Sequence, residues 1–184
     1  MSAELIPGVN GCLLVGANLA TAAAGRSHPL RAGAPSDREF FRSLRSQADL
    51  ILVGGKTFMA EPYRQSSVPL AIYARRDLLA VKSNPVARIV GGEIGDVISK
   101  LRDSFGGEPK ILCEGGPTLL HGLINNNLLD ELDLSIVAKF SESSELTSLL
   151  KGTKFRMPVS FKPIHVLQEN QTIFMRYVTE GHKF

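Results

Sequence analysis

Short apolar runs rich in valine, isoleucine and leucine alternate along this chain with amphipathic stretches, a pattern typical of an α/β domain. The run Cys12–Ala17 contains no polar position, which predicts a strand buried on both faces of a sheet. Leu132–Phe140 alternates apolar with polar or smaller residues and gives the clearest period-two strand in the chain. Further strands are predicted at Leu50–Val53, Val68–Tyr73, Val86–Val90 and Lys110–Cys113.

The end of the chain predicts a β-hairpin. Pro163–Leu167 and Thr172–Val178 are apolar-rich runs that flank the polar stretch Gln168–Gln171. Such a hairpin adds antiparallel strands to a sheet whose earlier connections are helical crossovers, so we expect a mixed sheet of about eight strands.

About four helices are predicted around this sheet. Ser36 begins the first, with Glu39 three residues later at the spacing of a capping box. Its apolar positions recur at helical spacing and should face a core: Phe40, Phe41, Leu44 and Ala48. Arg38, Arg42 and Arg45 form a separate stripe that we expect to be mostly solvated. The other helices are predicted at Lys56–Ala60, Ile94–Leu101 and Thr118–Ile124, the last with Pro117 in its first turn.

Two polar stretches interrupt the pattern. Thr21–Pro35 is long for a connection in a compact domain, and long ordered loops are often functional. Ser141–Ser160 is polar and irregular, with one helical turn expected near Leu149.

Composition narrows the function classes. The 184 residues are 43% hydrophobic and 21% charged, which fits a single globular domain over residues 1–184. The formal charge of +3 is small, and basic and aromatic residues do not interleave on one strand face, so no nucleic-acid partner is expected. Cys12 and Cys113 lie far apart in apolar surroundings, which indicates buried, reduced thiols in a cytoplasmic protein. With no run of 18 apolar residues and no secretory signal in Met1–Asn10, we expect no membrane partner.

Two segments share one design, in which an apolar strand leads into a pair of glycines and a helix whose first turn contains threonine. They are Leu50–Thr57 and Ile111–Thr118. Small residues let a ligand approach the backbone, and the unpaired amides at a helix start face an anion. Each segment alone could simply close a tight turn. Two of them at the carboxyl ends of strands favour a phosphate site, although neither matches GxxxxGK[ST] or GxGxxG.

Several other positions have two interpretations each. Gly91–Gly95 either closes a turn before a helix or contacts a cofactor. Arg75 and Arg76 follow a strand and form either a solvated pair or a bidentate phosphate contact. Glu114 ends a buried strand, so its carboxylate needs a partner in the protein or in a ligand. Glu61 is either a surface carboxylate or a ligand contact.

Hydrolytic and metal-dependent chemistry has no support in the chain. The four histidines have no metal-ligand spacing, and His121 and His165 are expected to be structural. No Ser-His-Asp, HExxH or CxxC arrangement can be identified, so no metal site is predicted.

In combination, three segments resemble a known family. Leu44–Glu61 reads LRSQADLILVGGKTFMAE, Glu114–Leu119 reads EGGPTL and Leu128–Val137 reads LLDELDLSIV. Together they resemble the reductase domain of bacterial riboflavin biosynthesis, over nearly the whole chain. The resemblance implies a dihydrofolate-reductase-like three-layer α/β fold and an NADPH-dependent enzyme. This family reduces the ribosyl group of 5-amino-6-(5-phosphoribosylamino)uracil to a ribityl group.

The resemblance also implies roles for individual residues. Gly54, Gly55 and Thr57 would lie against the nicotinamide side of NADPH. Gly115, Gly116, Pro117, Thr118 and Leu119 would surround its pyrophosphate. Arg75 or Arg76 would meet the 2′-phosphate, and Glu61 would be an acidic contact to cofactor or substrate. The substrate would be bound by Asn18, Ser27, Arg45 and Glu114, with Glu114 as the catalytic candidate, and the family favours a homodimer.

This chain departs from the family pattern at two places. The usual SLDG after the first strand is replaced by Asn18-Leu19-Ala20-Thr21, and the usual DPxLxxR segment is reduced to Glu61-Pro62-Tyr63-Arg64. The alternatives are therefore a reductase of shifted specificity, a dihydrofolate reductase proper, and a non-catalytic protein that only binds NADPH. The segment GGKTFMAE favours the second, whereas EGGPTL and LLDEL fit the riboflavin family better.

Overall fold

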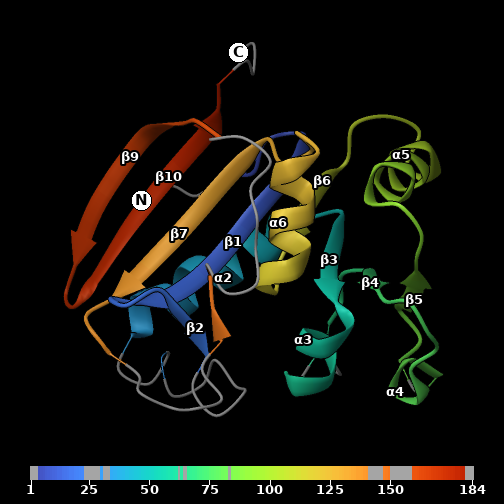
Figure 1. Cartoon of the computed structure of the whole chain (residues 1–184), viewed down its shortest axis with the longest axis horizontal. Coiled ribbons are helices and arrows are strands. Elements are labelled where there is room, and N and C mark those ends of the chain that lie inside the picture. The colour runs from blue at the N-terminus through green and yellow to red at the C-terminus, as the bar shows by residue number, and fades with distance from the viewer. Residues whose placement is uncertain are drawn as a thin grey trace.

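The computed structural model describes residues 4–22, 30, 34–61, 63, 66–82, 84–140, 147–149 and 159–180. Its centre is an eight-stranded sheet with strand order β5-β4-β3-β6-β1-β7-β10-β9 (Figure 1). The strands are β1 (Gly8–Gly16), β3 (Leu50–Gly54), β4 (Leu70–Tyr73), β5 (Ala87–Val90), β6 (Lys110–Cys113), β7 (Glu131–Val137), β9 (Phe161–Glu169) and β10 (Thr172–Thr179). Two short strands, β2 (Ala20–Ala22) and β8 (Thr147–Ser148), pair with each other.

The two halves of the sheet are built differently. β5, β4, β3, β6, β1 and β7 run parallel to one another, whereas β10 pairs antiparallel with both β7 and β9. The predicted mixed sheet and its closing hairpin are thus confirmed. The chain forms β3, β4 and β5 successively outward from the centre of the sheet and then returns to insert β6 between β3 and β1. Open α/β sheets bind ligands at such points, where the strand order changes direction.

Helices cover both faces of the parallel half, which confirms the three-layer architecture. They are α2 (Pro35–Gln47), α3 (Gly55–Ala60), α4 (Leu79–Lys82), α5 (Ile94–Ser104) and α6 (Pro117–Asn125). Side chains alternate along β3, so Leu50 and Leu52 pack with α5 and α6, while Ile51 and Val53 face Phe58 of α3. In Figure 1 α6 lies in front of the sheet and α2 behind it.

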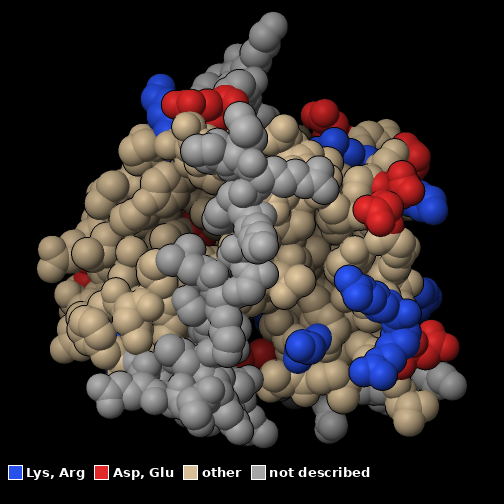
Figure 2. Space-filling model, in the orientation of Figure 1, with Lys and Arg blue, Asp and Glu red and all other residues tan. Residues whose placement is uncertain are grey.

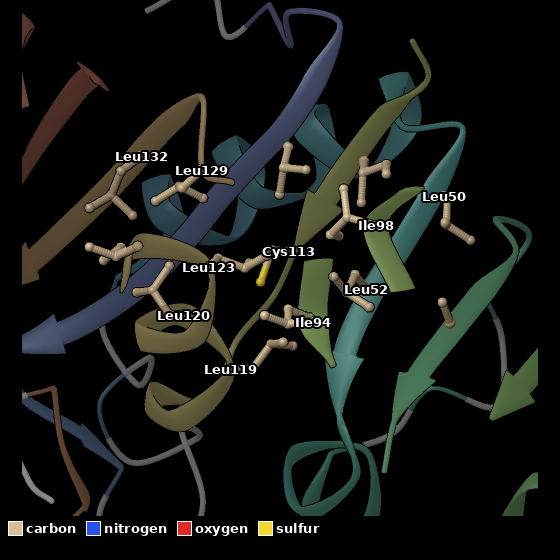
Figure 3. Packing of buried hydrophobic residues seen from close by; sticks show 14 residues of the cluster. Leu50, Leu52, Ile94, Ile98, Cys113, Leu119, Leu120, Leu123, Leu129 and Leu132 are labelled. Carbon is tan, nitrogen blue, oxygen red and sulfur yellow. The ribbon is translucent and has the colours of Figure 1, made fainter. Parts of the chain in front are cut away.

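The main core lies between α5, α6 and the sheet. Figure 3 shows Leu119, Leu120 and Leu123 of α6 beside Cys113, in a cluster that also takes in Ile94 and Ile98 of α5. Burying one such leucine side chain contributes roughly 1.5–3 kcal/mol, so this cluster anchors α6 and its first turn firmly on the sheet.

Both cysteines are buried in the core, in agreement with the sequence-based prediction, and neither is in a disulfide. Burial raises the pKa of the Cys113 thiol to about 12, with a smaller opposing effect of its backbone hydrogen bond to Gly115. The thiol therefore stays protonated and unreactive at neutral pH.

The start of α2 differs from the prediction. The helix begins at Pro35, and Ala34 at the N-cap position makes no side-chain capping bond, so the predicted Ser36 capping box is wrong. Proline has its φ already set for a first helical turn and lacks an N–H that would need a partner, so the N-cap lies at Ala34, two residues before Ser36. The Ser36 hydroxyl instead donates a 2.8 Å hydrogen bond to Glu169 Oε1 at the end of β9.

The polar stretches fall partly outside the described residues. Of Thr21–Pro35, residues 23–29 and 31–33 lie outside, and of Ser141–Ser160, residues 141–146 and 150–158 do. The helical turn expected near Leu149 stays a prediction, because residues 150–158 lie outside the described ones; the described part is the short strand β8, after which the Leu149 N–H donates to the carbonyl of Leu19 at 2.9 Å. Within the described ranges, no helix has the length and apolar character needed to cross a membrane.

Candidate active site

A cavity of about 1130 Å³ opens at the carboxyl ends of the parallel strands, bounded by α2, α3 and the start of α6. Its walls contain the residues Cys12, Leu13, Leu14, Thr21, Asp37, Phe41, Arg45, Gly54, Gly55, Lys56, Thr57, Met59, Ala60, Glu61, Tyr63, Tyr73, Ala74, Arg75, Arg76, Leu78, Glu114, Gly116, Pro117, Thr118 and Leu119. A cavity of this size at this place in the fold can hold two small molecules side by side.

The two glycine pairs predicted from the sequence contact each other at the floor of this cavity. The Gly54 N–H donates to the Gly115 carbonyl at 2.8 Å, and the Gly116 N–H donates to Thr57 Oγ1 at 3.1 Å. Gly115 has a φ of +81°, which favours glycine, and a Cβ on Gly116 would lie 2.9 Å from Thr57 Oγ1. We call Gly54, Gly55, Gly115 and Gly116 the glycine cradle; it presents bare backbone to the cavity.

The N-terminus of α6 follows directly after the cradle. Pro117 occupies the first turn, as predicted, and Thr118 and Leu119 line the cavity beside it. Backbone amides and the positive end of the helix dipole attract an anion at such a position.

Three basic residues line the cavity on the side of α3 and β4. Lys56, Arg75 and Arg76 are all exposed at its rim. Figure 2 shows Lys and Arg side chains gathered on this part of the molecule, over α3 and the ends of β4 and β5. An arginine pair beside a backbone cradle is suited to a second phosphate group on the same ligand.

The turn Gly91–Gly95 does not line the cavity. A Cβ on Gly91 would lie 2.8 Å from the carbonyl oxygen of Ala74, so this glycine allows two loops to pack closely. The geometry supports the turn interpretation over a cofactor contact.

Glu114, which directly precedes Gly115 of the cradle, is held by two protein side chains. Arg45 donates from Nε to Glu114 Oε1 and from Nη2 to Oε2, both at 2.5 Å, and the Tyr63 hydroxyl donates to Oε2 at 2.8 Å. The Glu114 side chain is 2% exposed and that of Arg45 is 31% exposed. Both carboxylate oxygens are therefore bound inside the protein, while the guanidinium reaches the cavity. We call Arg45, Glu114 and Tyr63 the Arg45 unit.

Electrostatics keep the Arg45 guanidinium charged and the Tyr63 hydroxyl protonated. Burial alone would lower the pKa of the Arg45 guanidinium, but the hydrogen bond and charge of Glu114 outweigh it and raise the pKa. Burial, followed by the charge of Glu114, raises the pKa of the Tyr63 hydroxyl well above its usual value. Tyr63 is therefore a permanent hydrogen-bond donor to Glu114 at physiological pH.

Helix α2 presents three unlike side chains to the cavity, spaced four residues apart: Asp37, Phe41 and Arg45. The Arg45 guanidinium lies 4.5 Å from the centroid of the Phe41 ring. The expectation of a solvated stripe separate from the phenylalanines holds for exposed Arg38 and Arg42 but is wrong for Arg45. Arg45 contacts Phe41 one helical turn earlier on α2. Its ion pair with Glu114 also joins it to the end of β6.

The structure brings most of the predicted site residues into this one cavity. They are Arg45, Gly54, Gly55, Thr57, Glu61, Arg75, Arg76, Glu114, Gly116, Pro117, Thr118 and Leu119. Gly115 joins them through its bond to Gly54, whereas Asn18 is exposed in the turn after β1 and is not among the residues of the cavity wall. Ser27 and Arg64 lie outside the described residues.

Sequence reasoning missed Asp37, Lys56 and Tyr63. Helical spacing puts Asp37 on the same side of α2 as Phe41 and Arg45, but only the structure shows that this side lines a cavity. Tyr63 follows α3 in an irregular segment, where no periodicity indicates the direction of a side chain. His121 is buried in α6 and His165 is exposed on β9, both away from the cavity wall. Among the described residues, no group of three or more His, Cys, Asp or Glu could hold a metal ion.

The fold resembles solved structures at low sequence identity. A Shewanella sp. PV-4 protein named for riboflavin biosynthesis has a TM-score of 0.77 at 14% identity, with 94% of this chain and 99% of that chain covered. The riboflavin biosynthesis reductase Rib7 of Saccharomyces cerevisiae has a TM-score of 0.70 at 14% identity, with 97% of this chain and 92% of that chain covered. Enterococcus faecalis dihydrofolate reductase, complexed with NADP(H), has a TM-score of 0.65 at 12% identity, with 94% of this chain and 96% of that chain covered. These likenesses establish the dihydrofolate-reductase-like fold.

Comparison at the level of sequence assigns the family. The comparison with curated proteins gave no match. The family model described as the RibD C-terminal domain matches residues 20–173, which covers most of the chain and contains both glycine pairs, Arg45 and Glu114. The chain therefore belongs to the RibD C-terminal domain family.

Proposed function

We propose that this protein is an NADPH-dependent reductase that converts the ribosyl group of 5-amino-6-(5-phosphoribosylamino)uracil, or of a closely related pyrimidine, to a ribityl group. The observation that carries the proposal is one cavity that is lined by both the glycine cradle and the Arg45 unit. Membership in the RibD C-terminal domain family supports it, as do the reductase name of the yeast relative and the NADP(H) bound to the dihydrofolate reductase.

The residues on the cradle side fit a phosphorylated nicotinamide cofactor. The glycine cradle and Thr57 would lie against the nicotinamide half, and Gly116 with the first turn of α6 would hold the pyrophosphate. Arg75 or Arg76 would meet the 2′-phosphate and so favour NADPH over NADH. Glu61, at the C-cap of α3 and in the cavity wall, would be an acidic contact at the boundary between cofactor and substrate.

The Arg45 unit would hold the substrate. Glu114 occupies Nε and Nη2 of Arg45, and the remaining nitrogen, Nη1, would meet an anionic group of the ligand. When bound, the cofactor supplies the hydride, which goes to C1′ of the opened ribosyl group. The contribution of the protein is then proximity and orientation, because Arg45 and its partners fix the substrate beside the cradle.

We also propose that residues 1–184 act as one cytoplasmic domain in a homodimer, as the family resemblance implies. The hairpin offers a surface for a second copy, since Val166 on β9 and Ile173 on β10 are 68% and 41% exposed. Sedimentation velocity would give the mass of a dimer; a monomer at micromolar concentration would refute this part of the proposal.

Turnover tests the proposed function directly. The wild type should oxidise NADPH when given the ribosylaminopyrimidine phosphate, and the product should be heavier by two hydrogens. Dihydrofolate in place of the pyrimidine should give no oxidation. Oxidation with dihydrofolate alone would identify a dihydrofolate reductase, and NADPH binding without any turnover would identify a non-catalytic binder.

Glu114→Gln tests the role of the carboxylate within the same assay. Glutamine keeps the shape but removes the charge that fixes Arg45, so turnover should fall about tenfold or more. NADPH affinity should stay nearly unchanged, because the cradle does not involve the Glu114 side chain. Loss of cofactor binding in this variant would contradict the assignment of Glu114 to the substrate side.

A further inference from the structure

One member of the Arg45 unit belongs to no helix or strand. Tyr63 lies in the connection between α3 and β4, lines the cavity and is 5% exposed. Its hydroxyl donates to Glu114 at 2.8 Å, and the centroid of its ring lies 5.2 Å from Cζ of Arg45. Because no helical or sheet hydrogen bonds fix the backbone of Tyr63, other contacts must hold it in place.

A buried asparagine from another connection supplies one of these contacts. Asn84 lies between α4 and β5 and is 7% exposed. Its Nδ2 donates to the Tyr63 carbonyl at 3.3 Å, and its Oδ1 accepts the Val86 N–H at 3.2 Å. The same Tyr63 carbonyl accepts the Ser66 N–H at 3.2 Å. Asn84 thus uses both ends of its amide to join the chain just before β5 to the backbone of Tyr63.

These contacts continue without a break into the cavity. Asn84 binds the Tyr63 carbonyl, the Tyr63 hydroxyl binds Glu114, and Glu114 binds Arg45. The first three residues are each less than a tenth exposed, and the Tyr63 ring is stacked on Phe58 with the two centroids 5.7 Å apart. Close-packed interiors transmit small displacements, so a shift of the Tyr63 backbone would move its hydroxyl relative to Glu114.

We infer that Asn84 is a positioning residue for the substrate side of the cavity, and that it acts on Arg45 through Tyr63 and Glu114. By fixing the tyrosine hydroxyl against Glu114, it keeps the guanidinium of Arg45 in one orientation toward the ligand. Asn84 is not among the residues of the cavity wall, so it acts only through its neighbours. This inference rests on the proposed function and deepens it by naming a residue outside the cavity that orients the anion contact.

Asn84→Asp tests the inference in the turnover assay. Aspartate keeps the shape and the acceptor for the Val86 N–H but has no donor for the Tyr63 carbonyl. The KM for the pyrimidine should rise about three- to tenfold, while the KM for NADPH stays unchanged. Ser66→Ala is the matched control, because it removes a hydrogen bond to the Val68 carbonyl in the same connection and should behave as the wild type. If the wild type turns over and Asn84→Asp has an unchanged pyrimidine KM, the inference is overturned and only the proposed function stands.

Carbon-13 labelling of the tyrosines gives a reading that needs no turnover. The Cζ signal of Tyr63, identified by its absence in Tyr63→Phe, reports the hydrogen bond of its hydroxyl to Glu114. Asn84→Ala, which adds no charge, should move this signal at neutral pH, and Ser66→Ala should not. Asn84→Ala also replaces Asn84→Asp in the kinetic test if the latter does not fold.

The signal separates the two proposals. If the wild type shows no turnover of the pyrimidine, the proposed function fails and the Tyr63 signal alone decides. A signal that moves in Asn84→Ala supports the positioning of the Arg45 unit by Asn84. A signal that stays in place overturns the inference, whatever the outcome of the turnover assay.

Discussion

Two buried arginine–carboxylate clusters in this molecule have similar chemistry and different surroundings. In one, Arg45 pairs with Glu114 at the end of β6; in the other, Arg176 of β10 pairs with Asp133 of β7 at 2.8 Å. Both carboxylate side chains are 2% exposed, but the arginine side chains are 31% and 6% exposed. The first arginine lines the large cavity and the second does not.

The hydrogen bonds of the two guanidinium groups explain the difference. Arg176 donates from Nε and Nη2 to Asp133 and from Nη1 to the Glu4 carbonyl, so every nitrogen has a partner within the protein. Arg45 gives Nε and Nη2 to Glu114 and turns its remaining side toward the cavity. The Arg176 cluster (Arg176, Asp133 and Glu131) is therefore structural, and the Arg45 unit is suited to a ligand.

Arg176→Met should give the largest effect, and on stability alone. It leaves two carboxylates, Asp133 and Glu131, buried without their cation, so the free energy of unfolding should fall by about 3–5 kcal/mol. Urea unfolding followed by circular dichroism measures this loss. NADPH affinity of the folded fraction should not change; a stable variant that has lost cofactor binding would reverse the roles of the two clusters.

Arg45→Gln should act on catalysis as well as on stability, because it also leaves the buried Glu114 carboxylate without its cation. The substrate loses its anion contact and Glu114 loses its partner, so kcat/KM should fall about 100-fold. Arg42→Gln, on the exposed side of the same helix, is the control and should retain wild-type activity. Equal activities of the two variants would show that Arg45 is no more than a surface charge.

The next effect is on the pH dependence of stability, which we expect to depend on Glu131 of the Arg176 cluster. Burial raises the pKa of Glu131 from 4.5 to about 7, with the charge of Asp133 adding to the rise and Arg176 opposing it. Between these pH values the folded chain holds a proton that the unfolded chain has lost. The Glu131 contribution to the free energy of unfolding therefore falls as pH rises, by about 1 kcal/mol per pH unit.

Glu131→Gln makes that measurement specific. Urea unfolding at several pH values from 4.5 to 7 should show a steeper loss of stability in the wild type than in the variant. Parallel profiles for the two proteins would mean that Glu131 does not titrate in this window.

Tyr63→Phe should give the smallest effect. It removes one hydrogen bond to Glu114 and keeps both the ring contact with Phe58 and the ion pair with Arg45. Stability should fall by about 1 kcal/mol and turnover a few-fold. A loss of activity as large as that of Arg45→Gln would mean that the hydroxyl contacts the substrate itself.

The fold could be predicted from the sequence because its strands are short apolar runs bounded by clear turn residues. Leu50–Val53 and Lys110–Cys113 lead into glycine pairs, and the structure brings these pairs into contact with each other beside the large cavity. The start of α2 could not be predicted from the Ser36 capping pattern, because the adjacent proline competes with it and the Ser36 hydroxyl binds Glu169, 133 residues away in the chain.

The site was harder to predict where long-range contacts decide. Glu114 was expected to need a partner, yet no local pattern indicated that Arg45 and Tyr63 would supply its hydrogen bonds from 69 and 51 residues away. Arg45 was misplaced on a solvated stripe because helical spacing alone does not show which side faces a neighbouring strand. The spacing of Asp37, Phe41 and Arg45 becomes informative only once the cavity is located.

Calorimetric titration of the wild type with NADPH, and then with NADH, tests the central claim most directly. Because the glycine cradle, the first turn of α6 and the pair Arg75 and Arg76 line one cavity, we expect saturable one-to-one binding of NADPH and weaker binding of NADH. No heat with NADPH, or equal affinity for both coenzymes, would contradict the account, the first by removing the cofactor site and the second by removing the role of the arginine pair.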